Sequence, residues 1–82
     1  MNRDSKLLLR ARTAPAGIRF TELCRLAESM GWACRAIRGS HHIFTRLGER
    51  VTMSFQNVDG YAKPYQVRQL IAWIDSQTGG TE

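Results

Sequence analysis

Hydrophobic and polar residues follow two different periods along the chain, and the change of period separates helices from strands. From Thr21 to Met30, apolar residues recur every three or four positions, which predicts an amphipathic helix capped by Thr21 and ended by Gly31. Pro64 begins a second stretch of this kind, since proline suits the first turn of a helix. Its predicted buried stripe is Val67, Leu70, Ile71 and Ile74. Two long helices are therefore expected, each with one apolar face.

Between these helices the period shortens to that of β-strands. Turn signals at Gly39-Ser40 and at Leu47-Gly48-Glu49 divide the segment into three short stretches. The predicted strands are 32–38, 41–46 and 50–56. In the third, Val51, Met53 and Phe55 alternate with polar residues, as in a sheet with one face on the core and one in water. The segment predicts a three-stranded antiparallel meander.

The predicted order is helix, three strands and helix, with a short additional helix in front. Residues 1–12 predict that short helix, and Pro15 and Gly17 end it because neither continues a helix readily. Both long helices have to cover the same sheet face, leaving the other face open. We therefore expect an α+β domain arranged like double-stranded-RNA-binding domains. Its expected parts are an N-terminal extension over 1–17, the domain over 18–76 and a flexible tail over 77–82.

Length and charge narrow the function. Eighty-two residues form one small domain, which excludes a two-domain enzyme or a large cofactor-binding fold. Twelve Lys and Arg against seven Asp and Glu give a net charge of +5, and ten of the twelve cations are Arg. The planar fork of arginine matches phosphate oxygens, so this bias favours a nucleic-acid partner. A basic but inert surface is the competing explanation.

Other segments suggest no membrane or metal chemistry. No apolar run is long enough to span a membrane, and Leu7-Leu8-Leu9 is too short for the core of a signal peptide. We therefore expect a cytoplasmic protein. The two cysteines, Cys24 and Cys34, lack the paired spacing of zinc ligands, and we expect both to be reduced structural thiols.

Both histidines follow a predicted tight turn, in Gly39-Ser40-His41-His42-Ile43-Phe44. Neighbours on a strand face opposite sides, so if Phe44 packs into the core, His42 shares its side and His41 lies on the open face. An exposed histidine can act as general base on an RNA 2′-hydroxyl, because imidazole titrates near neutral pH. For a histidine pair alone, plain strand residues bonded to nearby backbone are the commoner case. Both alternatives stay open at this point.

Two groups of basic residues are candidate RNA contacts. Lys63 at the start of the last helix and Arg68 on its first exposed turn could bind phosphate with the free N–H groups of the helix. A solvated helix start explains these two residues equally well. A second group lies on or beside the predicted hairpins and could form a basic rim around His41, although such runs are more often a solvated face. Its members are Arg35, Arg38, Arg46 and Arg50.

At Gly39-Ser40-His41 and the aromatic residue that follows, the sequence resembles the HicA family of toxin ribonucleases. The likeness covers residues 20–75. Phe20-Thr21-Glu22-Leu23 and Met30-Gly31-Trp32 resemble the family's first helix and its exit, and 60–68 resembles the entry to the second helix in one branch of the family.

The resemblance implies a double-stranded-RNA-binding-like fold, ribosome-independent and metal-independent cleavage of mRNA, and neutralisation by a HicB-type antitoxin. It assigns the catalytic role to His41. With Ser40 of the same motif, the expected RNA contacts are Arg38, Ser40, Arg46, Lys63 and Arg68. Neither a metal nor another cofactor is expected. The alternative is a non-enzymatic RNA-binding or partner-binding module in which His41 is only a strand residue.

Overall fold

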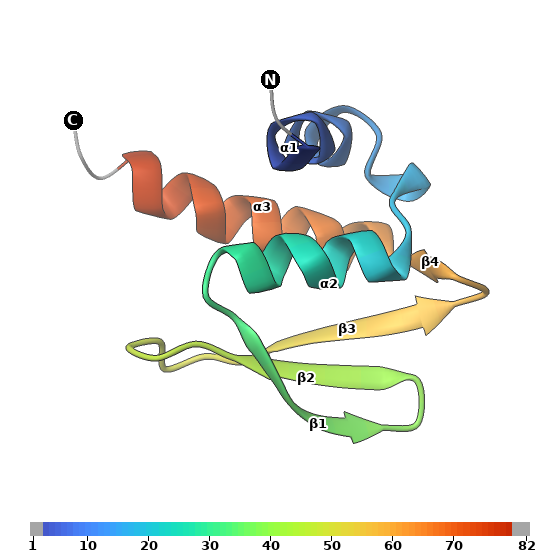
Figure 1. The fold of residues 1–82 in the computed structure, drawn as a ribbon, viewed down its shortest axis with the longest axis vertical. Helices are drawn as coiled ribbons and strands as arrows, with labels where there is room; N and C mark the ends of the chain where they lie inside the picture. The colour runs from blue at the N-terminus through green and yellow to red at the C-terminus, as the bar shows by residue number, and fades with distance from the viewer. Residues whose placement is uncertain (1–2, 80–82) are drawn as a thin grey trace.

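The computed structural model describes residues 3–79, whose helices and strands form three layers (Figure 1). The sheet is one layer, α2 and α3 cover one of its faces, and α1 lies on the far side of these two helices. The elements are α1 (Arg3–Thr13), the 3-10 turn η1 (Pro15–Gly17), α2 (Phe20–Ser29), β1 (Ala33–Arg38), β2 (His41–Thr45), β3 (Met53–Val58), β4 (Tyr61–Ala62) and α3 (Pro64–Gly79). The expected α+β architecture with an antiparallel sheet is confirmed, and the likeness to double-stranded-RNA-binding domains stays a prediction.

Within residues 3–79 the sheet has four antiparallel strands in the order β1-β2-β3-β4, so the expectation of three strands is wrong. The additional strand follows a hairpin turn at Asp59-Gly60, where both residues have positive φ, 52° and 89°. Asp-Gly suits such a turn because its twist matches that of the flanking strands. The Gly60 N–H donates to the Asn57 side chain at 2.7 Å. This turn brings Tyr61-Ala62 back against the end of β3.

The third strand begins later than the alternation predicts. Pairing with β2 starts at Met53, opposite Phe44, and the strand then continues to Val58. Val51, expected on the core face, lies before the strand and is 59% exposed. The connection between β2 and β3 therefore takes up residues 46–52.

The ends of α2 are set by backbone and carboxylate contacts. Arg19, and not Thr21, is the N-cap residue, and its N–H donates to the Glu22 carboxylate at 2.9 Å. Gly31 ends the helix as expected, in the left-handed conformation with φ 95°. The N–H groups of Gly31 and Trp32 donate to the carbonyls of Glu28 and Ala27 at 3.0 and 3.1 Å, the hydrogen-bond pattern of a Schellman motif.

Helix α1 packs into the common core. Leu7 and Ala11 of α1 are buried. Two ion pairs hold the helix from outside, Arg10 with Glu22 at 2.9 Å and Arg12 with Asp75 through two bonds of 2.5 and 2.9 Å. At the other end α3 runs to Gly79, so the expected tail begins inside this helix, and 80–82 lie outside the described residues.

The core lies between the helices and the side of the sheet that faces them. It combines residues from every layer: Leu7, Ala11, Ile18, Phe20, Leu23, Leu26, Ala27, Trp32, Phe44, Met53, Phe55, Ala62, Val67, Leu70 and Ile74. The two tryptophans meet edge to face, with ring centroids 5.3 Å apart. Trp32 belongs to the core, and Trp73 is partly buried against it. Of the helices described, none has the length and apolar character to cross a membrane.

Candidate nucleic-acid interface

The side chains of β2 alternate between the two faces of the sheet as the sequence predicts. Phe44 is 1% exposed in the core. His42 lies on the same side, where its ring meets that of Phe20 at 4.7 Å between centroids. His41 is exposed on the opposite face, which no helix covers (Figure 1). The prediction that His41 is the accessible imidazole is confirmed.

His41 lies in a row of residues that runs across the open face. Its pairing partner in β1 is Arg38, and its partner in β3 is Gln56. Residues paired across antiparallel strands share a face of the sheet and lie about 5 Å apart. A cationic side chain therefore stands beside the imidazole on the strand at the edge of the sheet.

Ser54 is the polar side chain in contact with the His41 ring. Its Oγ lies 3.4 Å from His41 Nδ1. Ser54 pairs with Ile43, so it reaches the ring diagonally from the neighbouring strand. When the Nδ1 proton is donated to this hydroxyl, Nε2 is left as the nitrogen that accepts a proton. Sequence reasoning places Ser54 on the solvent face but does not identify this contact, because it depends on the register between β2 and β3.

The turn before His41 is tied to the same strand. Gly39 has φ 61°, and Ser40 is exposed beside it. The Ser40 carbonyl accepts the Asn57 N–H at 3.2 Å, which extends the β2–β3 ladder by one bond. Ser40 therefore lies at the same end of the sheet as His41, beside Asn57 of β3.

The N-terminus of α3 also reaches this end of the sheet, and Gln66 attaches it there. The Gln66 side chain is 2% exposed, and its Oε1 accepts the Gln56 N–H at 2.7 Å. Pairing of β3 with β4 stops at Asn57 and Ala62. Lys63 follows directly after this last pair, and its Nζ lies 5.9 Å from the centroid of the Tyr65 ring. The sequence predicts Lys63 as a phosphate contact but gives no signal for the role of Gln66.

Arg46 does not belong to this row. It follows the far end of β2, where its Nε donates to the Met30 carbonyl at 2.7 Å. Its guanidinium lies over the Trp73 ring at 5.0 Å from the centroid. The expected basic rim around His41 therefore does not include Arg46, because two distant elements hold this side chain on the helix side of the sheet.

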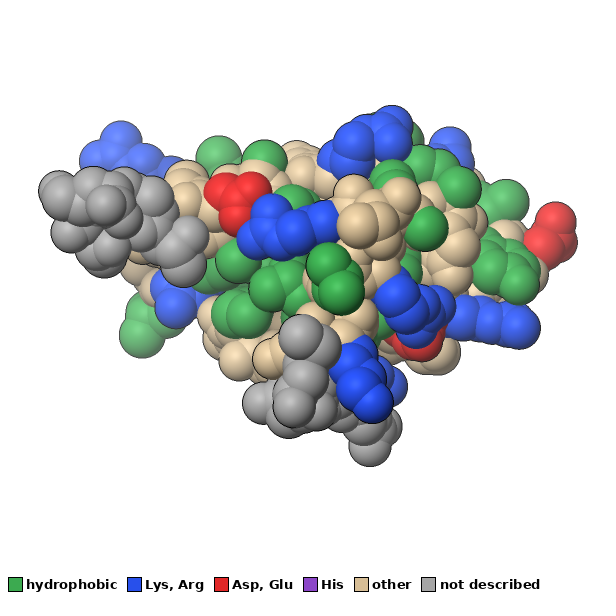
Figure 2. All heavy atoms as spheres, turned by 90° about the horizontal axis from the view of Figure 1, so that it is seen from above, with side chains coloured by type: hydrophobic (Ala, Val, Ile, Leu, Met, Phe, Trp, Pro, Cys, Tyr) green, Lys and Arg blue, Asp and Glu red, His purple; other side chains and the backbone are tan. Residues whose placement is uncertain are grey.

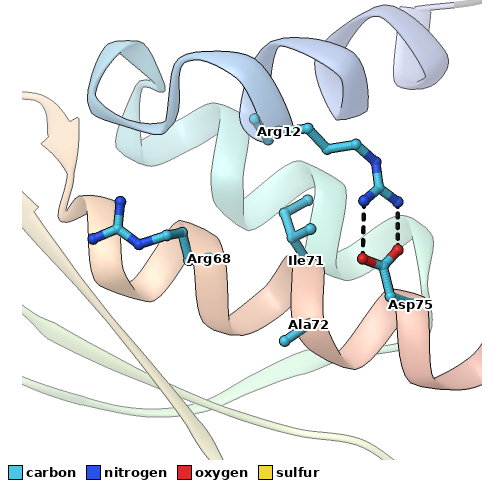
Figure 3. Close-up of a pocket in the computed structure, with 6 residues that line it drawn as sticks. Arg12, Arg68, Ile71, Ala72 and Asp75 are labelled. Carbon is cyan, nitrogen blue, oxygen red and sulfur yellow. Dashed lines mark hydrogen bonds and ion pairs between the residues drawn. The ribbon is translucent and has the colours of Figure 1, made fainter.

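Arg68 lies apart from the row as well. Figure 3 shows it on the first half of α3, in the hollow between this helix and α1 that is also lined by Arg12, Ile71 and Asp75. This hollow is on the helix side of the molecule, whereas His41 is on the open sheet face. Figure 2 looks onto the molecule from the side of α1, and no histidine is seen there. Lys63 lies just before α3, whereas Arg68 lines the hollow on the side of α1.

The two cysteines differ in exposure. Cys24 is half-buried, and burial raises the pKa of its thiol to about 12. Cys34 is exposed and is likewise free. Within residues 3–79, no three His, Cys, Asp or Glu side chains gather as a metal-binding group. The polar chemistry of the open face therefore comes from the row around His41.

One comparison with known proteins gives a match. The model of a family described as the HicA toxin of bacterial toxin-antitoxin matches residues 20–75, which include α2, the whole sheet and most of α3. The class defined by this match is the toxin of a toxin–antitoxin pair. The chain belongs to the HicA toxin family. No curated protein and no solved structure gives a significant match.

Proposed function

We propose that this toxin is an endoribonuclease that cleaves mRNA without a metal ion, with His41 as general base. The observation that carries the proposal is the position of one imidazole. His41 is exposed on the open sheet face beside Arg38, whereas the ring of the neighbouring His42 packs against Phe20. In cleavage of a phosphodiester, an accessible base can remove the proton of the attacking hydroxyl, and a nearby cation can stabilise the negative charge on the phosphate.

The proposed step is an attack within the RNA. His41 Nε2 removes the proton from a 2′-hydroxyl, and the 2′-oxygen forms a bond to the adjacent phosphorus as the bond from phosphorus to the 5′-oxygen breaks. The leaving oxygen takes a proton from water. The products are a 2′,3′-cyclic phosphate and a 5′-hydroxyl. In the tautomer that this step requires, Nδ1 carries the proton and can donate it to Ser54 Oγ, 3.4 Å away.

Three residues at the same end of the sheet serve as RNA contacts in this proposal. Arg38 pairs with His41, Lys63 lies between the end of β4 and the start of α3, and Ser40 lies in the turn between β1 and β2. The two cations bind phosphate oxygens on either side of the scissile bond. Such contacts carry little sequence information and position the backbone.

A toxin of this family has an antitoxin partner. We propose that this partner is a HicB-type protein, that it covers the row around His41, and that both act in the cytoplasm, where mRNA is the target. An acidic partner surface suits the net charge of +5, since complementary charge speeds association.

The decisive test uses purified toxin, an unstructured RNA labelled at one end, and EDTA in the buffer. We expect cleavage that persists in EDTA and fragments that end in a cyclic phosphate. Production of the toxin in cells should arrest growth, and co-production of the antitoxin should relieve the arrest. Tight RNA binding without cleavage, together with harmless production, would overturn the proposal in favour of a non-enzymatic RNA-binding module.

A further inference from the structure

A second feature of the open sheet face is the exposed ring of Tyr61. Tyr61 pairs with Val58 of β3 on one side and forms a β-bridge with Arg19 on the other. Because β3 alternates, Val58 and Gln56 lie on one face and Phe55 on the other, in the core. Tyr61 thus shares the open face with the row of His41.

The ring of Tyr61 is held in place. The Arg19 guanidinium lies over it, 4.7 Å from the centroid. The backbone around the tyrosine is bonded to the segment before α2 on both sides, since the Phe20 N–H donates to the Gly60 carbonyl and the Ala62 N–H to the Ile18 carbonyl, each at 3.0 Å. The residue still leaves 41% of its surface exposed. An aromatic side chain in contact with a cation is therefore exposed to the solvent on this face.

The distance from His41 suits a neighbouring nucleotide. Tyr61 lies two strands across from His41 and two residues along, which corresponds to roughly 12 Å in a regular sheet. Lys63 follows two residues after Tyr61, at the start of α3. An RNA strand bound at His41 and Lys63 therefore passes close to the tyrosine.

We propose that Tyr61, in contact with Arg19, stacks on an unpaired base of the RNA, so that the substrate is a single-stranded segment. This inference rests on the proposed function of His41. A base inside a duplex has its faces covered by its neighbours, whereas an unpaired base can stack on an aromatic side chain. A flexible single strand can also bring its 2′-oxygen in line with the leaving 5′-oxygen.

A binding experiment tests the stacking separately from the chemistry. The probe is a short unstructured RNA, 2′-O-methylated throughout so that the proposed step is blocked, with 2-aminopurine at one position of each oligonucleotide in a series. We expect the wild type to quench 2-aminopurine at one position of the series. Tyr61→Leu should lose this quenching and weaken binding roughly 5- to 150-fold, the range that stacking of one base supports. Tyr61→Phe, which keeps the ring, should retain both.

Controls separate stacking from loss of fold or of surface area. Leu47→Ala removes an apolar side chain that is 97% exposed in the connection between β2 and β3, and it should leave affinity unchanged. A thermal melt of each variant shows whether it is folded. The blunt duplex of the same sequence should bind more weakly than the single strand.

The inference is overturned if folded Tyr61→Leu binds the single strand as tightly as wild type, or if the duplex binds equally well. Both results are independent of cleavage. The wild type could instead show the tyrosine-dependent quenching and fail to cleave the unmodified RNA. That result would contradict the proposed function but would still support the stacking site.

Discussion

The link between α3 and the sheet at the candidate site depends on one buried amide, which Gln66→Leu removes. The Gln66 Oε1 is the acceptor for the Gln56 N–H at 2.7 Å, where pairing with β4 has stopped. Leucine keeps most of the side-chain volume, so the main effect is a backbone donor left without a partner. Such a donor costs about 1 to 3 kcal/mol of the free energy of unfolding. For a domain of this size the melting temperature falls by roughly 4 to 24 °C.

Urea unfolding and amide exchange measure this effect. The midpoint should fall with an unchanged slope, and the Gln56 amide proton should lose its protection in Gln66→Leu. The matched control is Gln69→Leu, on an exposed position of the same helix, for which a change within about 0.5 kcal/mol is expected. The reasoning is refuted if Gln66→Leu is as stable as wild type, or if Gln56 keeps its protection.

Three further outcomes follow from single contacts. A thiol reagent at pH 8 should label Cys34 quickly and Cys24 only on unfolding. Burial raises the pKa of Cys24 to about 12, so almost none of this thiol is ionised at pH 8. Equal labelling rates in the native state would contradict this prediction. The hydrogen bond from Arg10 lowers the pKa of Glu22, so the stability due to this pair is present above the ordinary glutamate pKa of about 4.3 and is lost as the pH falls below it. Arg10→Ala should flatten that part of the stability–pH curve, and an unchanged curve would show that the pair contributes nothing. Arg46→Ala should lower the free energy of unfolding by about 1 to 2 kcal/mol, because it removes the contacts with the Met30 carbonyl and the Trp73 ring, and should leave RNA affinity unchanged. Weaker RNA binding by a fully stable variant would show instead that Arg46 contacts RNA.

Much of the fold is predictable because it depends on local patterns. The apolar period of α2 and α3, the left-handed Gly31 and the alternation in β2 each involve residues close in sequence. The exposure of His41 follows from the same alternation. The short strand β4 escapes such reasoning, because two residues carry no period and their pairing depends on the turn at Asp59-Gly60.

The composition of the candidate site is less predictable, because it depends on which distant elements meet. Arg46 and Arg68 are basic like Lys63. Arg46, however, contacts Met30 and Trp73, and Arg68 lies on the side of α1. Basic character alone does not distinguish them. From the sequence, Gln66 is an ordinary polar residue of a helix. In the structure, β3–β4 pairing ends at Asn57, and the Gln66 side chain accepts the Gln56 N–H.

The most direct test of the central claim compares RNA cleavage by wild type, His41→Ala and His42→Ala in EDTA, with a thermal melt of each protein. His41 is exposed, so its variant should melt like wild type and cleave about 10²- to 10⁴-fold more slowly, the usual contribution of a general base. His42→Ala should lose about 0.5 to 1.5 kcal/mol of stability with its Phe20 contact and still cleave. Cleavage at the wild-type rate by a folded His41→Ala protein would contradict the claim.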